Sequence, residues 1–261
     1  MSPSVIGAQL YTLRDFLKTP LDIARTCARV KKLGYDAVQV SALGPIEVKE
    51  LAKILDGEGL SCAATHKSMD DMKNTAAILD YHATLKCRYT AIGGFGWGGK
   101  TLAEWQSFAR DYSLIARTLA AKGLRVGYHN HAHELCRVAD SPLTMPLELL
   151  VKTCEQAVWF EIDTYWVAFG GGDPAAWIER VAASGADRIP CVHFKDMLIS
   201  PDQKEHKMCE VGDGNLNWTR IFNACTRAGV EWYLVERDSG DLDPFESLKI
   251  SLDNLRAMGL H

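Results

Sequence analysis

Several features that mark special classes of protein are missing from this sequence. No run of about 18 apolar residues occurs, so no transmembrane helix is expected. The opening MSPSVIGAQL has neither a basic segment nor a long apolar one, so no secretory signal peptide is expected. The formal net charge of -4 leaves no basic excess for nucleic acid. We therefore expect a cytoplasmic protein with neither a nucleic-acid nor a membrane partner.

Motifs for redox chemistry and nucleotide binding are also absent. The 8 cysteines form no CxxC pair and lie mostly within apolar strand or helix patterns, which favours reduced, buried thiols. No GxGxxG motif or phosphate-binding P-loop follows the first apolar run. The glycine-rich GGFGWGG at 93–99 fits neither motif, and we interpret it as a flexible loop. These absences disfavour an open, doubly wound sheet that binds a dinucleotide.

Short apolar runs alternate with amphipathic stretches along almost the whole chain. The expected strands are Val5–Leu10, Asp36–Val40, Leu60–Thr65, Arg88–Ile92, Leu124–His129, Val158–Ile162, Ile189–Phe194 and Glu231–Val235. The expected helices are Thr19–Gly34, Pro45–Leu55, one after Asp70, Thr101–Lys122, Leu143–Gln156, Pro174–Ser184, Trp218–Ala228 and Asp243–Met258. This alternation predicts an α/β fold, a single (β/α)8 TIM barrel in one domain over residues 1–261. The longest irregular segment, Asp196–Asn217, is expected to be a flap over the mouth.

Polar side chains gather where the expected strands end. In a barrel of this type, function lies at the carboxyl ends of the strands and in the loops that follow them. The third strand ends near His66, the fifth near His129, the sixth near Asp163, the seventh near His193 and the eighth near Glu236. Random placement on a surface would not produce this concentration, so it indicates a site at the mouth.

The alternation of side chains along a strand selects which of these residues meet. If the faces that carry them point into the barrel, four residues from consecutive strands converge at one level: His129, Asp163, His193 and Glu236. Two imidazoles and two carboxylates suit one divalent metal ion such as Mn, Co, Zn or Mg. Singly, Asp163 also reads as a helix cap and Glu236 as a salt-bridge partner. Together, the four favour a metal site.

Further side chains near the mouth are candidates for catalysis and substrate binding. The candidates for a partner acid or a substrate contact are His66, His131, Glu134 and Lys195. Trp97 and Trp166 lie in expected mouth loops, where a flat ring can stack on a sugar.

Three more acidic residues close to the strand ends are expected to play structural parts. Glu161 shares a strand face with Asp163 and is expected to belong to an ion pair. Asp196 and Asp238 are expected to orient loops or the metal ligands.

At these residues the sequence resembles the xylose-isomerase-like superfamily of barrels. The resemblance covers nearly the whole chain and rests mainly on EIDTYW, GGGDP, VHFKD, the GDG–NW turn and LVERD. That superfamily includes sugar-phosphate isomerases and epimerases, keto-sugar 3-epimerases, inosose dehydratase and endonuclease IV. The chain looks most like the sugar isomerase/epimerase-like branch. Endonuclease IV is disfavoured because it needs several more metal ligands and because this chain is acidic.

The resemblance also implies a set of metal ligands. The superfamily's epimerases hold the metal with Glu, Asp, His and Glu from the fifth to eighth strands, and three of the four positions here agree. His129 replaces the fifth-strand glutamate, and Gln39 stands on the second strand where a glutamate is common. The change to His129 removes one negative charge and one base. Glu134 is a possible substitute for that base; otherwise Glu236 is the obvious carboxylate.

The leading hypothesis is a metal-dependent isomerase or epimerase that acts on a small sugar or keto-sugar through an enediolate. Glu236 would take the proton. One alternative is a lyase or dehydratase that acts on an oxidised sugar or cyclitol by β-elimination. Another is a sugar-binding barrel without catalysis. The native metal, the exact substrate, its phosphorylation and a possible homo-oligomer stay open.

Overall fold

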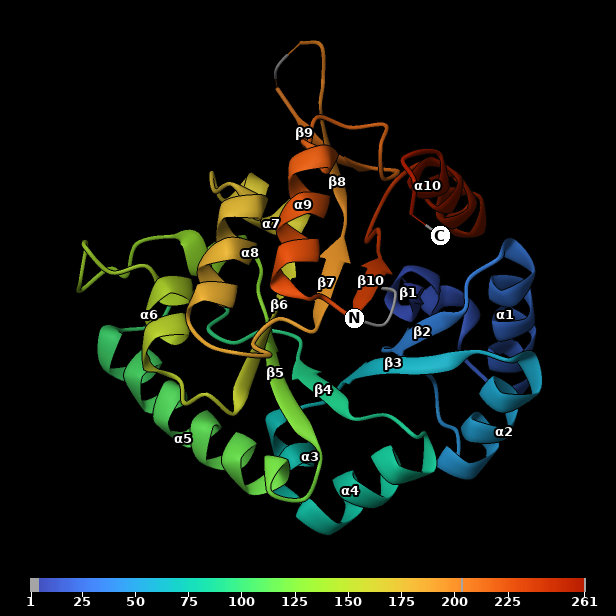
Figure 1. Ribbon diagram of the computed structural model, residues 1–261, viewed down its shortest axis with the longest axis horizontal. Coiled ribbons are helices and arrows are strands. Elements are labelled where there is room, and N and C mark those ends of the chain that lie inside the picture. The colour runs from blue at the N-terminus through green and yellow to red at the C-terminus, as the bar shows by residue number, and fades with distance from the viewer. Residues whose placement is uncertain (1–4, 203, 261) are drawn as a thin grey trace.

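Parallel strands close into a barrel in the computed structural model, which describes residues 5–202 and 204–260 (Figure 1). The barrel strands are β1 (Val5–Gln9), β2 (Ala37–Val40), β3 (Ser61–His66), β4 (Tyr89–Ile92), β5 (Arg125–His129), β6 (Val158–Asp163), β7 (Cys191–Phe194) and β10 (Trp232–Val235). Their order around the barrel is β1-β10-β7-β6-β5-β4-β3-β2. This arrangement confirms the predicted (β/α)8 barrel. The extent of the domain, residues 1–261, stays a prediction.

Helices surround the barrel on its outer side (Figure 1). They are α1 (Pro20–Leu33), α2 (Val48–Glu58), α3 (Met69–Lys73), α4 (Thr75–Thr84), α5 (Leu102–Ala120), α6 (Pro146–Thr153), α7 (Thr164–Phe169), α8 (Pro174–Ala183), α9 (Trp218–Ala228) and α10 (Pro244–Ala257). Side-chain caps begin two of these helices: Thr19 accepts the Asp22 backbone N–H at the start of α1, and Asp173 caps α8. Within the described residues, no helix is both long and apolar enough to cross a membrane.

Two expectations about the loops are wrong. Helix α6 begins at Pro146 rather than Leu143, because Val138 and Ser141 pair in a tight turn that leaves Leu143 exposed. The segment Asp196–Asn217 is not irregular throughout. Its strands β8 (Asp196–Ile199) and β9 (His206–Cys209) form an antiparallel hairpin that projects from the barrel (Figure 1). A role for this hairpin as a flap stays a prediction.

Short helical elements that the sequence did not reveal shape several of the loops. The 3-10 helices η1 (Leu10–Phe16) and η2 (Ala132–Leu135) follow β1 and β5 directly. Asn74 ends α3 and caps α4, so the expected single helix after Asp70 is interrupted. Of these elements, η1 contributes Tyr11 to the wall of the mouth.

The interior of the barrel is filled in layers. Trp159 is fully buried, and a Cβ on Gly127 of the neighbouring strand would lie only 2.2 Å from the indole ring. Glycine is therefore required at position 127 to make room for the tryptophan. Along β6, Glu161 and then Asp163 follow on the same inward face at spacings of two residues. An apolar floor thus supports a polar layer and, above it, the mouth.

His82 on α4 is a buried imidazole outside the mouth. Its Nε2 lies 2.8 Å from Thr65 Oγ1, and its Nδ1 lies 2.7 Å from the Ile78 carbonyl oxygen. The carbonyl accepts the single proton of a neutral ring, so Nε2 is left to accept from the threonine hydroxyl. Burial lowers the pKa of His82 from 6.5 to about 4. The folded protein therefore holds this imidazole neutral.

Replacing His82 by Gln is expected to reduce the loss of stability at mildly acidic pH. Below pH 6.5 the unfolded chain binds a proton at His82, whereas the folded chain binds it only near pH 4. The free energy of unfolding therefore falls as the pH is lowered from about 6.5 to about 4. The contribution of His82 to the loss between pH 7 and pH 5 is about 2 kcal/mol. Urea denaturation at the two pH values measures it. An equal loss in the wild type and His82→Gln would contradict the assignment.

Candidate metal centre at the mouth of the barrel

Four side chains from neighbouring strands meet at the mouth. His129 and Asp163 are the last residues of β5 and β6, His193 lies on β7 directly beside Asp163, and Glu236 follows β10. All four are buried, and one ligand atom from each lies within 4.8 Å of the others. The structure thus brings together the four residues that strand alternation selects. Their role as metal ligands stays a prediction.

The surroundings of His129 indicate that these four side chains fit a metal ion. Both of its ring nitrogens are buried and have no hydrogen-bond partner in the described part of the chain. Burial, with a further effect of His193, lowers the pKa of His129, so the ring is neutral and carries a free lone pair. An unsatisfied buried imidazole is costly, and a cation bound by its lone pair would remove that cost. The donor set therefore fits a divalent ion.

Asp163 is held with one oxygen toward this group. Its Oδ1 accepts the Trp166 backbone N–H at 2.8 Å, which caps α7, and Asn130 Oδ1 accepts the Asp163 backbone N–H at 3.2 Å. Its Oδ2 is 3.5 Å from His129 Nε2 and 3.7 Å from His193 Nδ1. Burial raises the pKa of Asp163, but Lys195 and the two imidazoles outweigh burial and hold it well below its usual range.

Lys195 provides the fixed positive charge of the site. Its fully buried ammonium lies 2.9 Å from Glu236, 3.4 Å from Asp163 and 2.8 Å from Asp238. Burial lowers the pKa of Lys195, but the three carboxylates outweigh burial and raise it. Burial likewise raises the pKa of Glu236, but the nearby charges of Lys195 and His193 outweigh burial and lower it. The Glu236 carboxylate is therefore ionised.

One ammonium faces three carboxylates. Burial lowers the pKa of His193, but Glu161 and Glu236 outweigh burial and raise it well above its usual range, so His193 offsets part of the remaining negative charge. The negative charge that is still left favours a bound cation.

A second polar layer lies directly beneath the four residues. Glu161 Oε2 is 2.7 Å from His66 Nε2 and 3.3 Å from His193 Nε2, so Glu161 meets two imidazoles that can serve as the expected ion-pair partners when protonated. Gln39 Nε2 donates to Glu161 Oε1 at 2.8 Å, and Gln9 Nε2 donates to Gln39 Oε1 at 2.7 Å. Sequence reasoning missed Gln9. The only signal for it was a polar residue on the inward face of an otherwise apolar strand.

The mouth above these layers is a cavity of about 350 Å³. The predicted site residues in its wall are His66, His129, His131, Lys195, Glu236 and Trp97. Trp97 is 63% exposed, and its ring packs against His131 with centroids 4.7 Å apart. Trp166 lies behind the wall, where the Lys195 ammonium is 5.4 Å from the centre of its ring. The cavity therefore combines side chains of the candidate metal-ligand group, an ammonium group and an exposed aromatic face.

Comparison with known proteins identifies the family. The family model described as xylose isomerase-like TIM barrel matches residues 27–258. The chain belongs to this xylose isomerase-like family. It is also 27% identical over 159 residues to an inosose dehydratase from Clostridium beijerinckii, a match that covers 55% of this chain and 51% of that protein. An inosose dehydratase from Lacticaseibacillus casei is 26% identical over 160 residues and is matched over 51% of its length. The chain therefore spans about half the length of these relatives.

Solved structures share the whole fold. A sugar phosphate isomerase/epimerase from Parabacteroides distasonis has a TM-score of 0.81 and 23% identity, over 100% of this chain and 96% of that one. An L-ribulose 3-epimerase has a TM-score of 0.72 and 18% identity, over 98% and 94% of the two chains. At these identities the likeness establishes the fold alone.

Glu134, a predicted substitute for the missing base, is not part of the group formed by the four candidate ligands. Its carboxylate accepts the Tyr128 hydroxyl at 2.7 Å and the His131 backbone N–H at 2.8 Å. Burial raises the pKa of Glu134 to about 8. The 3-10 turn η2 directs the side chain into the protein, where it fixes the backbone of His131. The structure does not bring Glu134 together with the four candidate ligands, and its catalytic role stays a prediction.

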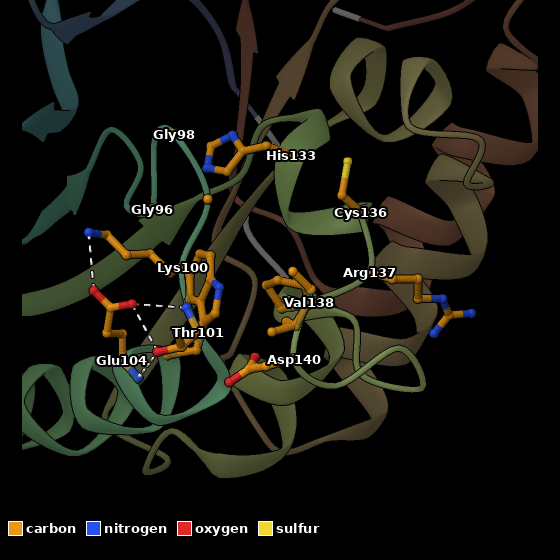
Figure 2. Close-up of a pocket in the computed structure, with 14 residues that line it drawn as sticks. Gly96, Gly98, Lys100, Thr101, Glu104, His133, Cys136, Arg137, Val138 and Asp140 are labelled. Atoms are coloured by element: carbon orange, nitrogen blue, oxygen red, sulfur yellow. Dashed lines mark hydrogen bonds and ion pairs between the residues drawn. The ribbon is translucent and has the colours of Figure 1, made fainter.

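A second cavity, of about 490 Å³, lies between the β4–α5 and β5–α6 loops (Figure 2). Lys100 is paired with Glu104 at 3.3 Å, while Glu104 also accepts the Thr101 backbone N–H and hydroxyl. Figure 2 shows Arg137 directed away from these residues. The Lys100 and Glu104 charges are thus already matched within the wall. The mouth cavity is the stronger candidate for chemistry.

Replacing Asp163 by Asn is expected to weaken divalent-metal binding by at least about 100-fold, because a carboxylate ligand is lost while its shape is kept. Titration of the chelator-treated protein with Mn²⁺ or Zn²⁺, followed by calorimetry, measures the affinity. Asp70→Asn is the matched control, since the Asp70 side chain is 88% exposed and outside the site. Equal affinities of the wild type and Asp163→Asn would contradict the proposed ligand set.

Proposed function

We propose that the chain is a metal-dependent sugar isomerase or epimerase that acts through an enediolate on a small sugar or keto-sugar. The observation that carries this proposal is the Glu236 carboxylate, which lines the mouth cavity beside His129, Asp163 and His193. A carboxylate held ionised at this point can remove the proton from a carbon next to a carbonyl group. The exposed Trp97 ring above it suits the flat face of a sugar.

His129, Asp163, His193 and Glu236 would hold the metal. A bound divalent ion would polarise neighbouring carbonyl and hydroxyl oxygens and so lower the barrier to proton removal. The ammonium of Lys195 would bind a substrate oxygen and keep Glu236 ionised. Asp238, which is partly exposed and 2.8 Å from Lys195, would accept a substrate hydroxyl.

His66 is the group best placed to exchange a proton from another wall of the cavity. His66 lies on β3, whereas Glu236 follows β10. By the shorter path around the barrel, two strands, β1 and β2, lie between them. The Nε2 of His66 is paired with the buried Glu161 carboxylate, an arrangement that orients an imidazole for proton transfer. Glu236 would take the proton from one carbon, and His66 would exchange protons with a neighbouring oxygen or with the opposite face.

A lyase is the second candidate function. Two observations favour it: the sequence matches are to inosose dehydratases, and a neutral imidazole, His129, stands where a second basic carboxylate is expected for epimerisation. In this reaction Glu236 takes the proton from carbon, the bond from the adjacent carbon to oxygen breaks, and His66 protonates the departing hydroxyl to give water. Both candidates share the same first step.

Replacing Glu236 by Gln is expected to slow turnover by about 10²–10⁴-fold, because the proton acceptor is removed. Keto-sugars and cyclitols are incubated with the metal-loaded protein in D2O, and the products are analysed by NMR and mass spectrometry. Deuterium on carbon without loss of water indicates an isomerase or epimerase, whereas a dehydrated product indicates the lyase. Exposed Glu246→Gln on α10 is the control.

Two results would overturn this proposal. Full turnover by Glu236→Gln would remove the residue from the reaction. Ligand-dependent stabilisation of the wild type, with no turnover and no dependence on metal, would indicate a sugar-binding barrel without catalysis.

A further inference from the structure

A continuous chain of buried hydrogen bonds runs beneath the metal cluster. It joins Gln9 on β1, Gln39 on β2, Glu161 on β6 and His193 on β7, each with 0% exposure. Glu161 precedes Asp163 by two residues on the same strand face and therefore lies one layer deeper than the candidate ligands. His193 belongs to both layers, because its two ring nitrogens face in opposite directions.

The two ends of this series of hydrogen bonds determine which group donates and which accepts at each step. At one end the Tyr11 backbone N–H, which can only donate, lies 3.1 Å from Gln9 Oε1. The other atom of that amide, Gln9 Nε2, must therefore face Gln39. At the far end Gln39 Nε2 lies 2.8 Å from the Glu161 carboxylate, which can only accept. Both constraints give the Gln39 amide the same orientation.

This orientation determines which nitrogen of His193 carries a proton. Gln39 Oε1 lies 2.6 Å from His193 Nε2, and an oxygen acceptor at that distance requires an N–H on the ring. Glu161 Oε2, 3.3 Å from the same nitrogen, is a second acceptor. The opposite nitrogen, Nδ1, lies 3.0 Å from Glu236 Oε2 and faces the candidate metal ligands. This carboxylate also accepts, so Nδ1 carries a proton when no metal is bound, and a metal at Nδ1 would replace that proton while the Nε2 proton stays in place, donated to Gln39 and Glu161.

We propose that Gln39, held by Gln9 and Glu161, is a positioning residue that keeps a proton on His193 Nε2 and so presents Nδ1 to the metal. The inference rests on the metal site of the proposed function. Hydrogen bonds on the far side of a metal-bound imidazole commonly fix its tautomer and its ring orientation. Here an amide and a carboxylate share that task.

The same argument decides between one metal ion and two. His66, Glu161 and His193 also place ligand atoms within 4.8 Å of one another, which is close enough for a second ion. That ion would need the lone pair of His193 Nε2, but the Gln39 oxygen requires a proton there. The layer beneath the candidate ligands is therefore a hydrogen-bonded support, and we expect one ion, not two, among the described residues. The two ring nitrogens differ because the acceptor at Nδ1, Glu236, is itself a candidate ligand and would turn to the metal, whereas Gln39 is held in place by Gln9 and Glu161.

The direct test uses the ¹⁵N-labelled protein loaded with Zn²⁺, which is diamagnetic. Zinc content per chain is measured first, and two-bond ¹H–¹⁵N spectra then identify the protonated and the metal-bound nitrogen of each histidine. We expect one zinc ion per chain and a His193 ring protonated at Nε2 and bound through Nδ1. Coordination through Nε2, or two zinc ions per chain, would overturn the inference and leave the proposed function standing. Absence of zinc binding would overturn both.

Variants of Gln39 separate positioning from packing. Gln39→Met keeps a side chain of similar length but removes the acceptor, and we expect about 10-fold weaker zinc binding with mixed His193 tautomers. Gln39→Glu, protonated where it meets Glu161, restores an acceptor to Nε2 and is expected to restore the wild-type spectrum. Gln156→Met at the surface is the control. An unchanged affinity and an unchanged His193 spectrum in Gln39→Met would contradict the role of Gln39.

Discussion

The burial of carboxylates around His193 is the constraint on which the rest of the site depends. Glu161 and Asp163 are fully buried and Glu236 is 5% exposed. Charges withdrawn from water are costly unless opposite charges or hydrogen bonds compensate them. Lys195 compensates part of this charge, and Gln39 and His66 satisfy Glu161. The excess that remains is the physical reason to expect a cation among the four strand-end side chains.

Strand periodicity was enough to predict the four candidate ligands. Side chains that alternate along parallel strands reach the mouth at one level, so His129, Asp163, His193 and Glu236 were selected together. Caps such as Thr19 and Asp173 were likewise predictable, because they depend only on residues within one helical turn. The family model and the closed barrel agree with the predicted fold, and the role of the four residues as ligands stays a prediction.

What the sequence did not reveal depends on contacts across the barrel or on the path of a loop. Gln9 is one polar residue in an apolar strand, and nothing local specifies its partner on β2. Glu134 stands close in sequence to His129 and His131, yet the turn at η2 directs it onto Tyr128. The strands β8 and β9 pair across a loop whose path the sequence did not reveal. Directly after this hairpin, the Asp196 carboxylate accepts the backbone N–H groups of Gly212 and Gly214, the loop-orienting role expected of it.

The layers of the barrel interior give the site its rigidity. Trp159 fills the floor, the amide and carboxylate layer orients His193, and the ligand layer opens to the substrate cavity. Such an arrangement would hold the candidate ligands in place before a metal binds and so reduce the reorganisation needed during the proposed reaction. It would serve isomerisation and elimination equally, because both begin with proton removal beside a carbonyl group. Under the proposed function, the choice between the two would depend on the groups that line the cavity, chiefly His66 and Lys195.

A crystal structure of the protein grown with Mn²⁺, with anomalous differences recorded, tests the central claim most directly. One strong peak is expected, bounded by His129, Asp163, His193 Nδ1 and Glu236. A map without a peak at the mouth, or with these side chains turned away from the ion, would contradict the account.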